Sequence, residues 1–486
     1  MMATAALRRL RTLTALTAAG VWFHTPTALT AEATPDAASA DVVLESNVMV
    51  AMRDGTQLAT DIYRPAQGGK ARDGRFPAIL MRTPYNKEVR ARAFSGSQAP
   101  ARYFASHGYV VVMQDVRGRY KSQGHWRPWY DDGRDGYDTT QWIGRQAWSD
   151  GRIGTVGTSY EGGTQQALAL ANAPNVKAMV PLFSVSNIAR YGIRHNGAFE
   201  LRWFDHWLKG VDNGVDREPP VRLYVMGGGD AHKTTEGRLF VGGHWRDEKD
   251  WPLARAKTTP YFLHAGGVLS ADAPAAAAPI TYRFDPRHPV PTLGGNLSSQ
   301  GPLASEGGAD QRCRTDLWTC EDGAPLSARN DILVFATPTL AEDLEVTGPL
   351  VVKLWASSDG PDTDFTAKLI DVYPPNADYP AGIDMIIGDS IVRARYRDGP
   401  TKPQMLERGK AYEFTIEMYP TSIVFQRGHR IRLDISSSNF PRFDVNPNTG
   451  EPLNDNRSSR VAENTVYLDP AHPSRILLPV IPAGTR

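Results

Sequence analysis

Ser159 lies in a glycine-rich segment that is typical of a catalytic nucleophile. The segment has the pattern Gly-x-Ser-x-x-Gly over residues 157–162, after a β-branched run at 151–156 and before a helical pattern at 163–171. A nucleophilic serine sits on a sharp strand-to-helix turn, and glycines beside it let the strand and the helix pass close to that turn. The first N–H groups of the helix then face the oxyanion. We predict that Ser159 is a nucleophile; the alternative is a glycine-rich turn with an incidental serine.

A catalytic serine needs a base to remove its proton and a carboxylate to orient that base. After a turn of this type the order along the chain is Ser, then Asp or Glu, then His. Of the eight histidines that follow Ser159, His195 lies just beyond the strand predicted at 176–182 and is the candidate base; the alternative is that it too is a surface or packed residue. His206 has Asp205 beside it, but neighbouring helical residues point about 100° apart and cannot form one arm of a triad. We interpret the remaining histidines as surface or packed residues.

The first half of the chain alternates between predicted strands and predicted helices. Helices are predicted at 101–106, within 131–148, at 163–171 and at 201–208. Apolar or alternating runs predict strands at 42–44, 47–50, 57–63, 76–81, 109–115 and 176–182. Alternation of this kind predicts a parallel, doubly wound α/β sheet covered on both faces. The turn at 157–162 then falls at the end of a sheet strand.

The second half of the chain contains no long helical pattern after Pro220. Short β-branched or alternating runs, separated by turn clusters, occur at 221–226, 346–355, 365–372, 390–396, 411–418 and 430–436. This pattern of short runs and turns predicts an all-β sandwich of the jelly-roll type. We therefore expect a doubly wound α/β domain at 42–210 and a jelly-roll domain at 211–482.

The N-terminal segment predicts export. Arg8, Arg9 and Arg11 precede an apolar run at 13–23, and small residues follow, which is the layout of a signal peptide at 1–33. We expect a periplasmic or secreted protein, with a disordered tail as the alternative. No other run is long enough for a membrane helix. In an exported protein, Cys313 and Cys320 are expected to form a local disulfide.

The charge balance argues against polyanionic partners. Lys and Arg number 54 and Asp and Glu number 53, so the chain has no electrostatic footprint for nucleic acid or for an anionic membrane. No residue pattern predicts a cofactor or a metal: the two cysteines have no neighbouring histidine, and Asp362 and Asp364 lack the regular spacing of a calcium loop.

Several motifs together resemble the X-Pro dipeptidyl-peptidase-like serine hydrolases, the group of cocaine esterase and the glutaryl acylases. They are the serine turn and the segments at 54–65, 82–85, 115–124, 136–143, 207–210, 361–365 and 436–442. The resemblance implies an α/β-hydrolase fold, truncated in this chain, and a small ester or amide substrate. It also implies that Ser159 is acylated, and that the Tyr85 hydroxyl and the Tyr160 backbone N–H bind the oxyanion. From its residues alone, Tyr85 is equally well an ordinary Pro-Tyr turn residue. We interpret Asp115 and Arg117 as a pair that orders a loop.

The chain departs from this family after the predicted strand at 176–182. The family's acid and histidine follow two later strands, in segments like Gly-Gly-Trp-x-Asp and Gly-Pro-Trp-x-His, and neither segment occurs here. We predict an internal deletion of the cap and the last two strands, with the junction between Phe199 and Arg202. The deletion would expose a sheet edge, to be covered by the β-domain or a second copy of the chain. Two hypotheses follow: a serine hydrolase with impaired activity, or a non-catalytic remnant or binding protein.

Overall fold

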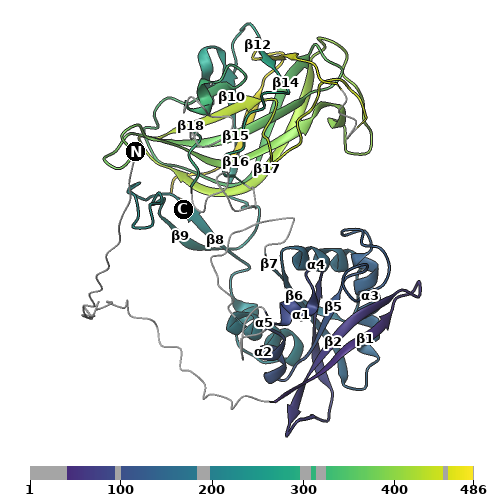
Figure 1. Ribbon diagram of the computed structural model, residues 1–486. Helices are drawn as coiled ribbons and strands as arrows, with labels where there is room; N and C mark the ends of the chain where they lie inside the picture. The colour runs from purple at the N-terminus through teal and green to yellow at the C-terminus, as the bar shows by residue number, and fades with distance from the viewer. Residues whose placement is uncertain are drawn as a thin grey trace, which may run out of the picture. The chain divides into compact units, whose positions relative to one another are not determined.

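Two units make up the chain in the computed structural model, Met1–Val215 and Asp216–Arg486 (Figure 1). The structure describes residues 41–92, 100–182, 197–295, 308–312, 324–452 and 458–484. The predicted signal segment, His195, Cys313 and Cys320 lie outside these residues. None of the helices in the described ranges is long and apolar enough to cross a bilayer.

The first unit is built on a mixed sheet in which the strand order is β1-β2-β5-β4-β6-β7. The outer hairpin of β1 and β2 and its pairing to β5 are antiparallel, whereas β5, β4, β6 and β7 run parallel to one another. The strands are β1 Val42–Ala51, β2 Gln57–Gln67, β4 Phe76–Thr83, β5 Val110–Asp115, β6 Ser149–Thr158 and β7 Val176–Leu182, and the short β3 Lys70–Ala71 pairs with β2. In the described part of the unit, β7 pairs on one side only, so it is an edge strand.

Helices cover both faces of this sheet (Figure 1). On one face lie α3, Asp132–Gly144, and α4, Tyr160–Leu170, which pack against each other. On the other face lie α2, Pro100–Ser106, and α5, Gly197–Lys209, over an apolar cluster that includes Phe104 and Phe204. The short helix α1, Lys87–Arg92, follows β4. The doubly wound sheet predicted from the alternating pattern is confirmed.

Close packing of α5 requires a glycine on the strand beneath it. A Cβ atom added to Gly154 of β6 would lie 2.5 Å from a ring carbon of Phe204 and 3.0 Å from a methyl carbon of Leu208. Both side chains are fully buried. Because interiors are packed to near crystalline density, this contact fixes the position of α5 over β6, beside the edge strand β7.

The second unit is a β-sandwich, as the sequence predicts. Its strands are β8 Val221–Met226, β9 Gly243–Glu248, β10 Lys257–His264, β11 Val268–Ser270, β12 Ile280–Phe284, β13 Leu333–Ala336, β14 Leu344–Ser358, β15 Asp364–Tyr373, β16 Ile383–Arg393, β17 Tyr412–Phe425, β18 Arg430–Ser436, β19 Ala462–Val466 and β20 Arg475–Ile481. Four 3₁₀ turns lie in the described residues, η2 Val215–Arg217, η3 Ala265–Gly267, η4 Leu326–Ala328 and η5 Ala394–Tyr396.

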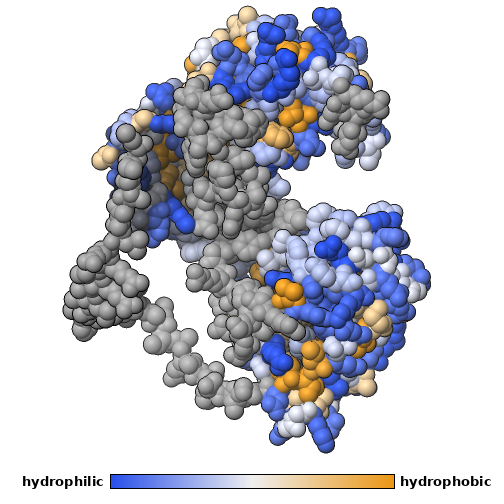
Figure 2. All heavy atoms as spheres, viewed as in Figure 1, coloured by the Kyte–Doolittle hydropathy of each residue, from blue (hydrophilic) through white to orange (hydrophobic). Residues whose placement is uncertain are grey.

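The hydrogen-bonded strands of this unit curl over so that distant strands share one core. The order is β16-β15-β18-β13-β11-β10-β20-β14-β17-β8-β9, with β12 and β19 paired beside this path. Although β15 and β17 are far apart in that order, the rings of Phe365 and Phe414 lie 4.8 Å apart between centroids. One apolar cluster joins residues of both halves. In the view of Figure 2 the surface is mostly hydrophilic, with hydrophobic residues in small areas.

Candidate active site

Ser159 occupies the turn between β6 and α4, with a backbone conformation that a serine rarely adopts. Its φ is 63° and its ψ is −120°, and its side chain is exposed. The Ser159 N–H donates to the carbonyl of Leu182 at 2.9 Å, and the N–H groups of Gly162 and Gly163 donate to the Ser159 carbonyl. Positive φ costs energy for a residue with a Cβ atom, so the surrounding structure holds this turn in place. The geometry is that of a nucleophile elbow.

Tyr85 lies at the end of β4, opposite the serine. Its hydroxyl is 3.3 Å from the Ser159 hydroxyl, and 43% of the residue is exposed. The turn that carries it is fixed by the Tyr85 N–H, which donates to the Thr83 hydroxyl, and by Arg119, which donates to the Pro84 carbonyl at 3.1 Å. A phenol at this distance can donate to an oxygen that develops negative charge beside Ser159.

Tyr160, the first residue of α4, has its side chain buried under the neighbouring loop. Its hydroxyl donates to Asp132 at 2.8 Å and accepts hydrogen bonds from the Trp129 N–H and the Trp126 indole. Burial, and next the Asp132 carboxylate, raise the pKa of Tyr160 to about 12, so the phenol stays protonated. The anchored ring fixes the start of the helix, where the first backbone N–H groups have no intrahelical acceptor. The Tyr160 N–H is therefore available to an oxyanion.

An ion pair that the sequence analysis missed supports the serine from beneath. Arg90 of α1 donates from Nε and Nη2 to the two carboxylate oxygens of Glu161, at 2.8 and 3.1 Å. Glu161 is almost completely buried and also accepts from the Thr158 N–H, next to the serine. Glu161 can be recognised from the local sequence as an acid in the first turn of a helix. Its partner Arg90 cannot, because it is 71 residues away in the sequence.

The predicted pair of Asp115 and Arg117 is wrong. Asp115 instead accepts a hydrogen bond from the backbone N–H of Lys87, and burial raises the pKa of its carboxyl. Arg117 binds Asp54 and Asp135 on either side of it. Both residues still order the loops around the site, but each does so through partners that are distant in the sequence.

Among the residues that the structure describes, Tyr85 is the only side chain that is hydrogen-bonded to the Ser159 hydroxyl. His206 contacts the carbonyl of Val211 through Nδ1 and lies on α5, so it is not brought to the serine. His195, the candidate base, falls outside the described residues, and its role stays a prediction. Within the described ranges no cluster of His, Cys, Asp and Glu is arranged to hold a metal ion.

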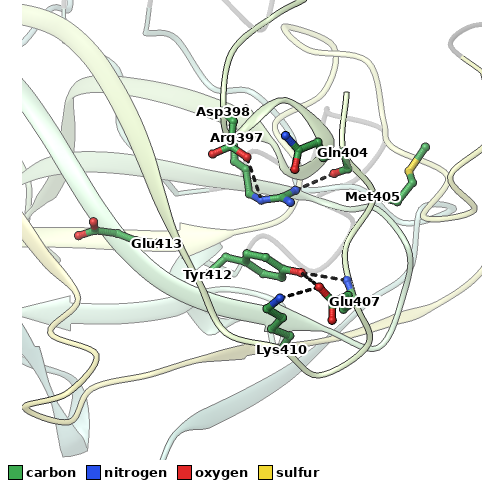
Figure 3. A pocket seen from close by; sticks show the side chains of 8 residues that line it. All are labelled: Arg397, Asp398, Gln404, Met405, Glu407, Lys410, Tyr412 and Glu413. Carbon is green, nitrogen blue, oxygen red and sulfur yellow. Dashed lines mark hydrogen bonds and ion pairs between the residues drawn. The ribbon is translucent and has the colours of Figure 1, made fainter. Parts of the chain in front are cut away.

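A pocket in the second unit is lined by eight residues, none of which is a serine, a cysteine or a histidine (Figure 3). It has a volume of about 390 Å³. The Arg397 guanidinium lies 4.4 Å from the centre of the Tyr412 ring and donates to the Gln404 carbonyl, while Lys410 pairs with Glu407. Because its charged groups satisfy one another, this pocket does not compete with Ser159 as a site of chemistry. Its lining residues are Arg397, Asp398, Gln404, Met405, Glu407, Lys410, Tyr412 and Glu413.

Two family models match the chain and together cover most of it. The model described as X-Pro dipeptidyl-peptidase (S15 family) matches residues 54–262. The model described as X-Pro dipeptidyl-peptidase C-terminal non-catalytic domain matches residues 213–477. The first match contains the serine turn and Tyr85, and the second contains the β-sandwich.

Among known proteins, the chain is 30% identical to the cocaine esterase of Rhodococcus sp. (strain MB1 Bresler), over 90% of this chain and 98% of that protein. The alignment runs over 591 positions, but 90% of 486 residues fill only about three quarters of them. About a quarter of the aligned positions therefore have no residue in this chain. Since the ends of the relative are covered, those positions are gaps inside the match.

Solved structures share the fold over almost the full length. An aminopeptidase from a marine sediment archaeon, Thaumarchaeota archaeon, superimposes with a TM-score of 0.67 at 22% identity, over 94% of this chain and 99% of that chain. An α-amino acid ester hydrolase superimposes with a TM-score of 0.65 at 23% identity, over 93% and 99% of the two chains. At these identities the likeness establishes the fold.

Proposed function

Because the chain belongs to the X-Pro dipeptidyl-peptidase (S15) family of serine hydrolases, we propose that it cleaves a small ester or amide through an acyl-enzyme on Ser159. The Ser159 oxygen attacks the carbonyl carbon, and the Tyr85 hydroxyl and the Tyr160 N–H stabilise the resulting oxyanion. The leaving group departs with a proton, and water then hydrolyses the acyl-serine bond. The observation that carries this proposal is the 3.3 Å approach of Tyr85 to a serine held at positive φ.

We further propose that proton transfer is the impaired step. In the described residues neither an imidazole nor a carboxylate is hydrogen-bonded to Ser159, β7 is an edge strand, and the match to the esterase contains large internal gaps. These three observations support a deletion between β7 and α5, where the family places its acid and its histidine. A positioned base contributes about 10²–10⁴-fold to rate, so we expect acylation that is slow by roughly that factor.

Labelling with a fluorophosphonate tests the nucleophile, and hydrolysis of p-nitrophenyl acetate tests turnover. We expect slow, specific labelling of Ser159 that is absent in Ser159→Ala. We also expect weak hydrolysis that added imidazole accelerates in the wild type but not in Ser159→Ala, once the direct reaction of imidazole with the ester has been subtracted. Imidazole in solution supplies the missing base, so acceleration separates a lost base from a lost nucleophile. Turnover at the level of ordinary esterases, unaffected by imidazole, would overturn the impaired mechanism.

The alternative function is a non-catalytic remnant or binding protein. The lack of any base or acid on Ser159 in the described structure is the observation that favours it. A serine that lacks both a base and working oxyanion donors does not react measurably with a fluorophosphonate. Absence of labelling, in protein that unfolds cooperatively and with imidazole present, would therefore select this alternative over the hydrolase.

We propose that residues 1–33 are removed on export, that Cys313 and Cys320 form a disulfide, and that a second copy of the chain covers the free edge of β7. The intact mass of the mature protein, before and after reduction and alkylation, tests the first two. Light scattering on the purified protein tests the third: a monomer at micromolar concentration would refute it.

A further inference from the structure

The loop between β5 and α3 carries exposed aromatic side chains close to the nucleophile. We call residues 116–131 the aromatic loop. Tyr120, Trp126, Trp129 and Tyr130 are each between 42% and 63% exposed. Large apolar side chains are normally found exposed singly, and a group of them beside one site indicates that something binds there.

Contacts with Tyr160 and with Arg119 fix the rings of Trp126 and Trp129 to the residues around Ser159. The Trp129 ring stacks on the Tyr160 ring, with centroids 4.9 Å apart and planes inclined by 19°, and the Trp126 indole donates to the Tyr160 hydroxyl at 3.2 Å. The Arg119 guanidinium lies 4.7 Å from the centre of the Trp126 ring and donates from Nε to the carbonyl of Pro84. The aromatic loop thus joins Tyr160, next to the nucleophile, to the turn that carries Tyr85.

The backbone of the aromatic loop is strained in the same way as the serine turn. Tyr120 has a φ of 48° and Trp129 a φ of 60°, close to the 63° of Ser159. The other non-glycine residues with positive φ in the described part of the first unit are asparagines, which adopt this conformation at low cost. Strain in bulky residues persists where the structure holds a site in one geometry.

We propose that Trp129, supported by Trp126, binds an aromatic ring of the substrate beside Ser159. One face of Trp129 lies on Tyr160, and 45% of the residue remains exposed to receive a second ring. Recognition is apolar, because the nearby charges are engaged: Asp132 accepts from Tyr160, and Arg119 donates to Pro84. The inference rests on the proposed hydrolase function, and it narrows the substrate to esters or amides that carry an aromatic group.

The ring could belong to the acyl group or to the leaving group, and matched ester pairs distinguish the two. One pair is methyl phenylacetate and methyl cyclohexylacetate; the other is benzyl acetate and cyclohexylmethyl acetate. Each pair differs only in the aromaticity of one ring. Since aromatic stacking adds about 0.5–1.5 kcal/mol beyond burial, we expect kcat/KM to favour the aromatic member of one pair by roughly two- to tenfold.

Substitutions of Trp129 test whether this preference comes from stacking. Trp129→Leu should abolish the preference of kcat/KM for the aromatic ester, whereas Trp129→Phe should retain most of it. Trp207→Leu is the matched control, since Trp207 is 43% exposed. It lies near the end of α5, where Lys209 contacts the residues before β5, at the opposite end of the strands from Ser159. A preference that survives in Trp129→Leu, or none in the wild type, would overturn the inference.

A binding measurement keeps the test independent of turnover. With ¹⁵N-labelled indoles, the Trp129 resonance is identified by its loss in Trp129→Leu, and phenylacetamide or cyclohexylacetamide is then added. We expect the phenyl compound alone to shift this resonance, even if Ser159 proves unreactive. A shift without labelling of Ser159 would refute the proposed hydrolase but keep the aromatic site. Labelling without a shift, or equal shifts with both compounds, would refute the aromatic site alone.

Discussion

The hydroxyl groups of Tyr85 and Ser159 are 3.3 Å apart, although the two residues lie on different strand ends and 74 positions apart in the sequence. Their approach depends on the parallel pairing of β4 with β6, which brings the carboxyl ends of both strands to one edge of the sheet. The substrate oxygen that becomes negative would sit between the phenol and the start of α4. Stabilisation of that oxygen, as proposed above, needs only these two groups and does not depend on which residue accepts the serine proton.

Tyr85→Phe should lower the rate of fluorophosphonate labelling by about 10²-fold, because loss of one oxyanion donor costs about 10²–10³. Thermal unfolding should change little, since the phenol is half-exposed. Tyr419→Phe is the control: Tyr419 is 42% exposed in the second unit. Equal labelling rates for Tyr85→Phe and the wild type would make Tyr85 an ordinary turn residue.

Ser159→Gly should be more stable than Ser159→Ala by about 1 kcal/mol. Both variants lose the nucleophile, but only glycine adopts a φ of 63° without steric cost. Strain of about 1–3 kcal/mol is relieved, and the greater entropy of glycine in the unfolded chain offsets about 0.4–1 kcal/mol of it. Urea unfolding of the two proteins measures the difference. If Ser159→Ala is the more stable of the pair, the turn is not strained.

The elements of the first unit could be predicted from local patterns because each pattern has one structural outcome. Apolar runs such as residues 109–115 fit a strand buried on both faces, and the glycines around Ser159 fit only a tight strand-to-helix turn. The edge position of β7 could also be predicted, because the sequence lacks the family's segments for the two strands that would follow it. The start of α4 was predicted less precisely, because the helix begins at Tyr160, three residues before the predicted start.

Other features could not be predicted because they depend on distant partners. Short strands such as β11 and β19 have little internal pattern and form only by pairing with neighbours in the sandwich. The ion pair of Arg90 with Glu161, and the pairing of Arg117 with Asp54 and Asp135, join residues far apart in the sequence. The stacking of Trp129 on Tyr160 likewise joins two residues from different elements and required the fold.

Gly157→Ala should disrupt the elbow. A Cβ atom on Gly157 would lie 2.4 Å from the Cβ of Glu161 and 3.2 Å from its backbone, so α4 would have to move. Overpacking of this kind costs about 1–3 kcal/mol, and we expect labelling of Ser159 to fall with stability. Gly388→Ala is the control, since its Cβ would meet only Met418, at an ordinary 3.7 Å. Unchanged labelling in Gly157→Ala would show that the strand and helix do not need this close approach.

Glu200, in the first turn of α5, should make the stability of the protein depend on pH. Its carboxyl is only 8% exposed, and burial raises its pKa from 4.5 to about 7. The folded state therefore binds this proton more tightly than the unfolded state. The stabilisation that comes from protonated Glu200 is fully present below about pH 4.5 and is lost as the pH rises through 7. The shift corresponds to about 3 kcal/mol.

Glu200→Gln removes this titration while keeping the shape of the side chain. We expect the variant to be more stable than the wild type at pH 8, by up to about 3 kcal/mol, and to match it near pH 4.5. The free energy of unfolding in urea, measured from pH 4.5 to pH 8, gives the comparison, and Glu417→Gln, at an exposed position on β17, is the control. Since the amide cannot ionise, a difference that stays constant with pH would mean that the pKa of Glu200 is the same in the folded and unfolded states. The effect of its burial on α5 would then have to be offset by a nearby cation.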